Sequence, residues 1–342
     1  MSLRMSRSRG FVTSDRAHRL AAGEGPPPRN EPDATNSGHV MTHEWRIEVV
    51  DEWASTPDSE PPRTTDEPLG TKEKFWVRAP DNNRYLFKYA RVRHGRTMGE
   101  DWVEWAVHEL ATLLSIPTAT AIPALHGGRR GVLSLSVLTA GDRLIHGNEI
   151  LARADPDYDS EITRQNARYT VNAVHDALDG VAAPLSCRPP IRTAFDAWAG
   201  YLMLDAWVAG RDRHHENWAA IEHDGELRLS PSFDHGNALG FQEPESNVQR
   251  LAEDDASIAQ WARHGRSHHF SGRPALVHLA STALALTSDE VREHWHGRLA
   301  SPTDHDVMSV LAQVPSAYLS ESGRIFRTKL LHLNRERILH GD

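Results

Sequence analysis

The sequence predicts an α+β protein in which a small, strand-rich first part precedes a larger, mainly helical second part. Between about residues 74 and 138, short runs of alternating apolar residues are separated by turn-forming residues, a pattern typical of antiparallel strands. Beyond about residue 142, apolar residues recur at intervals of three and four, as they do on one face of a helix. We therefore divide the chain into a tail at 1–40, an N-terminal lobe at 41–140 and a C-terminal lobe at 141–342.

The composition is that of an ordinary globular protein. Of the 342 residues, 39% are hydrophobic and 25% are charged, which provides apolar material for one or two cores. The net charge of −9 gives no overall attraction to nucleic acid or an anionic membrane. The single cysteine excludes an intramolecular disulfide and a zinc-thiolate site. Because neither a membrane span nor the apolar core of a signal peptide is recognisable, we expect a cytoplasmic protein.

Two polar stretches lie on either side of the first predicted strand. Residues 1–40 contain Pro26-Pro27-Pro28 and few apolar residues, so they cannot offset the entropy lost on ordering and are expected to be disordered. The stretch 55–68 separates a strand candidate at 45–50 from the first dense apolar block. We expect it to be a linker or a surface loop.

The first dense block predicts a hairpin followed by a helix. Two runs rich in aromatic and β-branched residues, centred on residues 76 and 87, are separated by Asp81-Asn82-Asn83, as in a β-hairpin. Residues 101–114 carry apolar side chains at helical spacing, and Pro117 marks the end of the helix. Strand candidates at 119–125 and 131–138 follow, and a hinge to the second lobe is expected near 137–143.

The second lobe is expected to be built mainly of helices. The candidates cover 160–178, 191–208, 274–286, 288–299, 304–314 and a final segment that ends near 339. Thr287 and Glu290 have capping-box spacing at one helix start. Two strand candidates at 218–222 and 226–230, joined by Asp224-Gly225, lie between the second and third of these helices.

Carboxylates and a carboxamide gather directly after the helix that ends near residue 208. Asp212, His214 and Asn217 form an Asp-x-His-x-x-Asn pattern, and Asp234 follows the next predicted hairpin. Phosphoryl transfer needs an acceptor near the attacking hydroxyl and oxygen ligands for Mg²⁺ on the nucleotide phosphates. Mg²⁺ keeps several waters, so one Asp and one Asn suffice as protein ligands. These residues are therefore the types that phosphoryl transfer requires.

A lysine in the first lobe provides a charge of the kind that phosphates bind. Lys88 lies in the second strand of the predicted hairpin between apolar neighbours, where it would present a point charge to phosphate oxygens. A carboxylate has to hold this lysine in place. The helix that follows offers Glu104, which we prefer, and Glu109 as its rival.

Together these residues resemble the HipA-like kinases, bacterial serine/threonine kinases that are often paired with antitoxins. The motifs that carry the resemblance are Leu69-Gly70-Thr71-Lys72, Leu86-Phe87-Lys88, Glu104 with Ile116-Pro117, Asp212-x-His214-x-x-Asn217 and Phe233-Asp234. The resemblance implies a two-lobed protein-kinase-like fold that uses ATP and Mg²⁺ to phosphorylate Ser or Thr of a protein. The family's N-terminal subdomain is not recognisable here, which leaves an antitoxin or other regulatory partner open.

The resemblance also implies a role for each position of the second-lobe motif. Asp212 would be the catalytic base or the carboxylate that orients the acceptor hydroxyl. His214 would brace the catalytic loop rather than transfer a proton. Asn217 and Asp234 would be the Mg²⁺ ligands.

In the first lobe, the resemblance assigns the nucleotide contacts. Lys88 would contact the α- and β-phosphates and would be held by Glu104. The Gly70-Thr71-Lys72 turn would cover the nucleotide phosphates with its backbone N–H groups. Thr71 would then be a candidate site of autophosphorylation.

Three alternatives remain open at this stage. The loop is also similar to that of phosphatidylinositol kinases, so a lipid or small-molecule acceptor competes with a protein, although the negative net charge favours a protein. A catalytically inactive pseudokinase that binds partners is the second alternative. The third is a metal-dependent hydrolase whose Zn²⁺ or Mn²⁺ ligands are drawn from Asp212, His214, His215, His235 and the downstream histidines. These downstream histidines, His268-His269 and His294-x-His296, are expected to lie on the surface.

Overall fold

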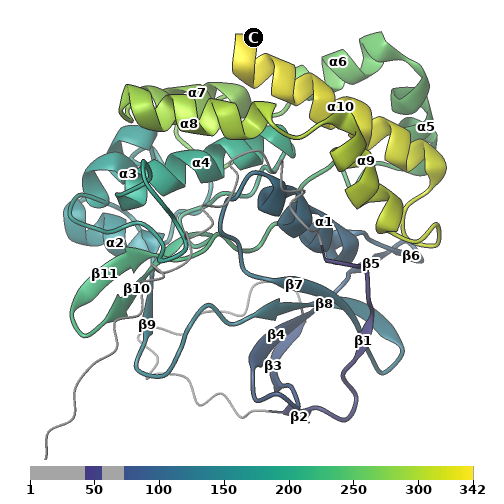
Figure 1. The fold of residues 1–342 in the computed structure, drawn as a ribbon, viewed down its shortest axis with the longest axis horizontal. Coiled ribbons are helices and arrows are strands. Elements are labelled where there is room, and N and C mark those ends of the chain that lie inside the picture. Colours follow the sequence, from purple (N-terminus) through teal and green to yellow (C-terminus); the bar gives the residue numbers. More distant parts are fainter. Residues whose placement is uncertain (1–42, 56–72, 342) are drawn as a thin grey trace, which may run out of the picture. The chain divides into compact units, whose positions relative to one another are not determined.

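The computed structural model describes residues 43–55 and 73–341 (Figure 1). These residues lie within one compact unit. The tail predicted at 1–40, almost all of the polar stretch at 55–68 and the Gly70-Thr71-Lys72 turn lie outside the described residues.

A six-stranded sheet forms the first part of the described chain. In sheet order its strands are β1 (Glu48–Val49), β7 (Ala121–His126), β8 (Arg129–Leu135), β4 (Arg84–Tyr89), β3 (Lys74–Arg78) and β2 (Ala54–Ser55). All neighbours pair antiparallel except β1 and β7, which run parallel. The predicted hairpin is present as β3 and β4. A separate two-stranded pair, β5 (Val92–Arg93) and β6 (Arg96–Thr97), follows β4.

The alternation of side chains along β4 decides what each face of the sheet carries. Tyr85, Phe87 and Tyr89 are buried in an aromatic-rich cluster on one face. Because successive side chains of a strand point to opposite faces, Lys88 points to the other face, where the first helix packs. The alternation in β4 therefore places the lysine, and not an aromatic ring, on the face of the sheet that the first helix covers.

Helix α1 (Glu100–Leu113) packs against β7 and β8 and lies between the sheet and the helical part of the chain (Figure 1). Its buried apolar residues, among them Trp102 and Trp105, belong to the main core. The guanidinium of Arg130 on β8 donates to both carboxylate oxygens of Asp101, at 2.8 and 3.0 Å. This bidentate pair fixes the start of the helix to the sheet.

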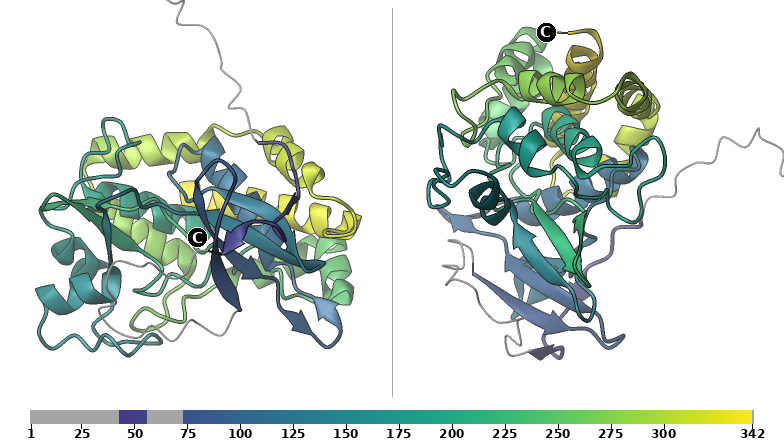
Figure 2. Two further views of the ribbon diagram at one scale, coloured as in Figure 1. Left: turned by 90° about the horizontal axis from the view of Figure 1, so that it is seen from below. Right: turned by 90° about the vertical axis from the view of Figure 1, so that its left-hand side faces the viewer.

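The second part is mainly helical, as Figures 1 and 2 show. A three-stranded sheet of β9 (Arg143–His146), β10 (Ala219–His223) and β11 (Glu226–Leu229) lies beside it. The helices are α2 (Gly147–Ala154), α3 (Val171–Ala177), α4 (Ala194–Trp207), α5 (Glu245–Glu253), α6 (Asp255–Arg263), α7 (Leu276–Ala285), α8 (Asp289–Ala300), α9 (Asp304–Gln313) and α10 (Glu321–His340). Within the described ranges, no helix is both long enough and apolar enough to cross a membrane.

Helix α4 is the central element of the helical part. All of its residues except Asp196 are buried, and it contacts α7, α10 and β11. A helix that is apolar on all sides is stable only inside a core. The segment from Asp212 to Asn217 begins a few residues after α4 ends, so it follows directly on a buried and rigid helix.

The predicted fold class is confirmed, with differences in detail. The predicted helix at 160–178 is wrong over its first half: only α3 is helical. Before α3, the side-chain amide of Asn166 donates to the carbonyls of Asp159 and Ile162, and such bonds compete with helix formation. The predicted capping box is also wrong, because Ser288 and not Thr287 caps α8, with its hydroxyl accepting from Val291 N–H. Helices α2, α5 and α6 were not predicted.

The close packing of α4 against α8 can be tested by its effect on the stability of the protein. A Cβ atom at Gly200 would lie 2.6 Å from the indole of Trp295, so we expect Gly200→Ala to lower the free energy of unfolding by about 1–3 kcal/mol through overpacking. At Gly297, in the interior of α8, a Cβ would meet nothing within 4 Å. Gly297→Ala is the control and should raise stability by about 0.5–1 kcal/mol. Urea unfolding of the two variants gives the comparison, and equal effects would contradict this packing.

Candidate functional site

A buried lysine joins three separate segments of the chain. Lys88 Nζ on β4 donates to Glu104 Oε1 on α1 at 3.1 Å and to Asp234 Oδ1 in the loop after β11 at 3.3 Å. Lys88 and Glu104 are both almost fully buried, at 9% and 4% exposed. The site therefore brings together a strand, a helix and a loop that are distant in the sequence.

The charge of Lys88 is stabilised by its two carboxylates. Burial by itself lowers the pKa of this ammonium, but Asp234 and Glu104 together raise it above its usual value. The lysine is therefore protonated at neutral pH. Because one cation faces two carboxylates, the group carries excess negative charge, which favours a further cation nearby.

The loop that carries Asp234 packs closely against α1. Asp234 has a positive φ of 60°, a conformation that costs energy for a residue with a side chain. Two residues later, a Cβ on Gly236 would lie only 3.2 Å from Glu104 Oε2 and 3.3 Å from the backbone oxygen of Glu100. A glycine at this point lets the loop approach the helix, and this approach places Asp234 within reach of Lys88.

The loop after α4 places Asp212 and Asn217 beside Asp234. The amide Nδ2 of Asn217 donates to the backbone carbonyl of Asp212 at 2.6 Å, which fixes the orientation of the carboxamide. All three side chains line one small cavity, together with Asp205, Gly210, Arg213, His235, Asn237 and Ala238. The structure thus gathers the second-lobe residues that the sequence had singled out around a common space.

A buried ion pair holds this loop in shape. Arg213 donates to both oxygens of Asp205 at 2.7 and 2.8 Å, and its Nη1 donates to Asn217 O and Ser232 Oγ, both at 2.9 Å. Burial raises the pKa of Asp205, although Arg213 beside it acts in the opposite direction. One guanidinium therefore connects α4, the Asp212–Asn217 loop and the segment before Asp234.

The carboxylate of Asp212 is paired with a histidine from a distant loop. His269 Nδ1 lies 2.6 Å from the carbonyl of Thr163, and its Nε2 lies 2.9 Å from Asp212 Oδ1. A carbonyl only accepts, so Nδ1 carries a proton. Burial alone would raise the pKa of Asp212, but the hydrogen bond from His269 and the nearby histidines outweigh it and lower that pKa. The contact with His269 therefore favours the ionised form of Asp212.

The other histidines of the motif are inside the fold but make different contacts. The ring of His214 packs beside that of His269, His215 shares a hydrogen bond with the hydroxyl of Tyr158 at 2.7 Å, and His235 is buried. Burial lowers the pKa of His214 and of His215 to about 4, so both rings are neutral. In the described parts of the chain, a group of three His, Cys, Asp or Glu side chains whose ligand atoms lie within 4.8 Å of one another occurs at His43, His108 and Glu109, outside this loop.

The two candidate partners of Lys88 lie in different surroundings. Glu104 contacts Lys88, whereas Glu109, fully buried, accepts a hydrogen bond from the backbone N–H of His43 at 2.7 Å. Gly70, Thr71 and Lys72, predicted to cover the phosphates, lie outside the described residues. Their role in covering the phosphates therefore stays a prediction.

Sequence reasoning missed the residues that support the site. Asp205 and Arg213 were given no role, although Arg213 stands inside the motif. The expectation that His268 and His269 both lie on the surface is wrong for His269, which is 5% exposed, and right for His268. Two adjacent histidines carry no periodicity that distinguishes the buried one, so only the tertiary contact with Asp212 identifies it.

Comparison with known proteins supports the fold. No family model and no curated protein matches the sequence. Among solved structures, the Helicobacter pylori proinflammatory kinase CtkA is similar with a TM-score of 0.65 and 14% identity, over 86% of this chain and 96% of CtkA. A chain of the Shewanella oneidensis MR-1 complex of HipA, HipB and operator DNA is similar with a TM-score of 0.51 and 11% identity, over 83% of this chain and 68% of that one. The two-lobed kinase-like fold, expected from the resemblance to HipA-like kinases, is therefore confirmed.

The contribution of the buried Arg213–Asp205 ion pair to stability can also be tested. Arg213→Met leaves Asp205 buried without its counter-charge, so we expect it to lower the free energy of unfolding by about 3–5 kcal/mol. Arg168 likewise makes two bonds to carboxylate oxygens, in its case one to Asp155 and one to Asp157, but its side chain is half exposed. Arg168→Met is the matched control and should cost about 0–1 kcal/mol. Chemical unfolding measures both, and a cost for Arg213→Met as small as that of the control would contradict the bracing role.

Proposed function

We propose that this protein is a Mg²⁺-dependent kinase that transfers the γ-phosphate of ATP to a serine or threonine hydroxyl of a protein. The observation that carries the proposal is the contact of Lys88 with both Glu104 and Asp234. Protein kinases require a lysine–glutamate ion pair for the nucleotide phosphates and an aspartate for the metal. Here the two requirements meet at one ammonium group.

The residues around the cavity fit a Mg²⁺ ion. Asn217 uses its amide nitrogen for Asp212 O, so its carbonyl oxygen is available as a ligand, and the Asp234 carboxylate lines the same cavity. An oxygen-only donor set suits Mg²⁺, and the excess negative charge around Lys88 favours a cation. When bound, the ion would neutralise charge on the transferred phosphoryl group. We assign Asn217 and Asp234 as its protein ligands.

The chain's own groups have complementary tasks in this reaction. Lys88, held by Glu104, would bind the α- and β-phosphates of ATP. His269 donates to Oδ1 of Asp212, which leaves the other oxygen, Oδ2, for the acceptor hydroxyl. Asp212 would orient this hydroxyl and accept its proton, while His214 would brace the loop. Gly70, Thr71 and Lys72 would cover the phosphates, and Thr71 would be a site of autophosphorylation.

A protein acceptor is favoured over a lipid by charge. The net charge of −9 opposes binding to an anionic membrane surface, which polybasic segments normally mediate. The similar Shewanella structure contains HipA with HipB and operator DNA. We extend the proposal to a regulatory protein partner of the antitoxin kind, to be sought by co-purification from the native source.

The proposal is tested by incubating the purified protein with Mg²⁺ and γ-labelled ATP, in the presence of cell lysate or lipid extract. We expect labelled Ser or Thr residues, identified by mass spectrometry. Asp234→Ala should reduce the rate by a factor of about 10²–10³ or more, since it removes charge stabilisation of the transferred group. Asp179→Ala, a change of an exposed aspartate far from the site in sequence, is the control and should leave the rate unchanged.

The other outcomes of this experiment separate the alternatives. Labelled lipid without labelled protein would replace the protein acceptor by a phosphatidylinositol-type substrate. Binding of ATP without transfer to any acceptor would identify a pseudokinase. Undiminished transfer by Asp234→Ala would remove the assignment of the metal ligand and, with it, the proposed mechanism.

The pair of Asp212 and His269 predicts a pH dependence. Asp212 must be ionised to accept a proton, and His269 lowers its pKa, so activity is retained down to lower pH than with an unpaired carboxylate. His269→Ala removes the hydrogen bond that lowers the pKa of Asp212, so we expect the acidic limb of the pH profile of kcat/KM to move to higher pH. His269→Gln keeps a neutral donor and should shift the limb less. An acidic limb that does not move in His269→Ala would contradict the pairing.

A further inference from the structure

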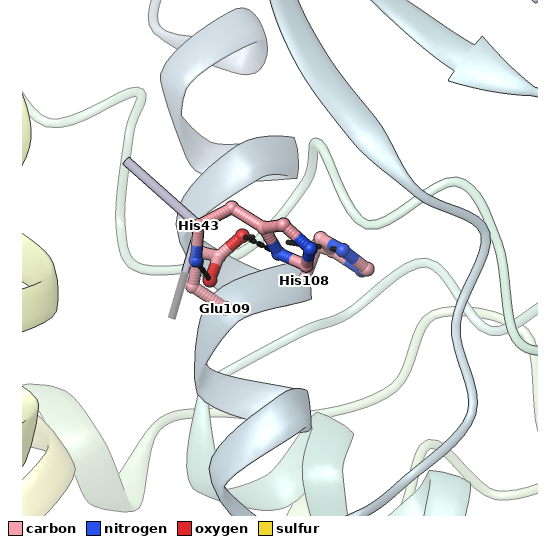
Figure 3. A group of neighbouring side chains, drawn as sticks. All are labelled: His43, His108 and Glu109. Carbon is pink, nitrogen blue, oxygen red and sulfur yellow. Dashed lines mark hydrogen bonds and ion pairs between the residues drawn. The ribbon is translucent and has the colours of Figure 1, made fainter. Parts of the chain in front are cut away.

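A second group of polar side chains lies away from the Lys88 site, where the segment before β1 crosses α1. His43 comes from that segment, and His108 and Glu109 are neighbours on the helix. Their potential ligand atoms all lie within 4.8 Å of one another. Figure 3 shows the two imidazoles and the carboxylate gathered beside α1.

We propose that His43, His108 and Glu109 form a Zn²⁺ site that fastens the segment before β1 to α1. Two imidazole nitrogens and one carboxylate oxygen suit Zn²⁺, whereas Mg²⁺ and Ca²⁺ prefer oxygen ligands alone. Three protein ligands leave one position of a tetrahedral ion for water. The side chain of His43 is 67% exposed, so the group is accessible to solvent on the side of this histidine.

The unsatisfied nitrogen of His108 is the first observation that supports the site. His108 is 7% exposed, and its Nε2 has no hydrogen-bond partner. This nitrogen lies 4.0 Å from Glu109 Oε1, so it is aimed into the group. A buried polar atom without a partner costs free energy, and a metal ion between Nε2 and the carboxylate would remove that cost.

The surroundings of His108 set the tautomer that a metal needs. Its Nδ1 lies 2.7 Å from the hydroxyl oxygen of Thr118. When Nδ1–H donates to this oxygen, Nε2 keeps its lone pair and points to the site. Metal-bound histidines are held in this way by a partner on their other ring nitrogen.

The carboxylate of Glu109 is the second observation. Its side chain is fully buried, and the hydrogen bonds it accepts come from the backbone N–H and the Nδ1 of His43, at 2.7 and 3.1 Å. A buried carboxylate is costly without a counter-charge. A divalent cation would supply it.

The geometry is close to that of a tetrahedral zinc ion. Bonds of about 2.0 Å place neighbouring ligand atoms roughly 3.3 Å apart. The distance from His43 Nδ1 to Glu109 Oε1 is 3.1 Å, and that from His108 Nε2 to the same oxygen is 4.0 Å. His43 is exposed and its segment is anchored by Trp45, whose ring packs against Trp105 at 4.9 Å. The His43–Glu109 distance already fits a tetrahedral ion, whereas the His108 ring and the Glu109 carboxylate would have to move closer together when the ion binds.

The test is zinc binding to the full chain, measured by titration calorimetry after treatment with a chelator. Excess Mg²⁺ is kept present so that the proposed kinase site does not take up zinc. We expect one tight equivalent in the wild-type protein. The zinc X-ray absorption spectrum of the complex should show only nitrogen and oxygen neighbours of the ion at about 2.0–2.1 Å, together with scattering from imidazole rings.

Two variants remove ligands, and one controls for the other histidines. His43→Ala changes an exposed ligand, and His108→Leu fills the buried position with an apolar side chain. Each variant should weaken zinc binding on the order of 100-fold, because removing even a residue that only supports a metal ligand weakens metal binding by about 10- to 100-fold. His223, also exposed, pairs with Asp142 at 2.7 Å, so His223→Ala is the matched control and should bind as the wild type does.

Zinc should also raise the melting temperature of the wild type and of His223→Ala, and not of His43→Ala. Asp234→Ala should bind zinc unchanged, so this result does not depend on the kinase proposal. The proposed site would be overturned if the His43→Ala protein folds and still binds zinc as tightly as the wild type. Sulfur neighbours of zinc in the X-ray absorption spectrum would also overturn it.

Discussion

The buried ammonium of Lys88 is the interaction on which the arrangement of the site depends. A charged amine inside a protein is stable only when carboxylates surround it. Glu104 and Asp234 meet this need from two segments that are far apart in the sequence, one from α1 and one from the loop after β11. Pairing the charge of Lys88 therefore fixes the sheet, helix α1 and the loop that carries Asp234 relative to one another. Binding of nucleotide would act on this same balance of charges.

The loop that carries Asp212 and Asn217 depends on a second buried charge. α4 is apolar on nearly all sides, yet it carries Asp205, which is buried and paired with Arg213. The same guanidinium reaches Asn217 O and Ser232 Oγ. Because breaking such a pair leaves an uncompensated charge in the core, the loop keeps one conformation. A rigid loop is what precise positioning of an acceptor hydroxyl requires.

Helix α1 connects the proposed kinase site to the proposed zinc site. Glu104 and His108 are one turn apart and lie on the same side of the helix. His108 contacts Thr118, and Thr118 bridges to Ser232, whose hydroxyl accepts from Arg213. The segment before β1 thus reaches the Asp212–Asn217 loop through a short chain of contacts. Fastening that segment would restrain the helix that holds Lys88 in place.

Local patterns in the sequence predict the order of the main strands and helices and mark the side chains that stand out by type and spacing. Alternation in β4 and helical spacing in α1 and α4 are local properties, and Lys88, Asp212, Asn217 and Asp234 stand out by their types and spacing. The partners of these side chains are set by contacts between distant segments of the fold. His269 meets Asp212 across 57 positions and His43 meets Glu109 across 66, and no periodicity encodes such pairs. Which of several histidines is buried follows from packing between elements, which a single stretch of sequence does not contain.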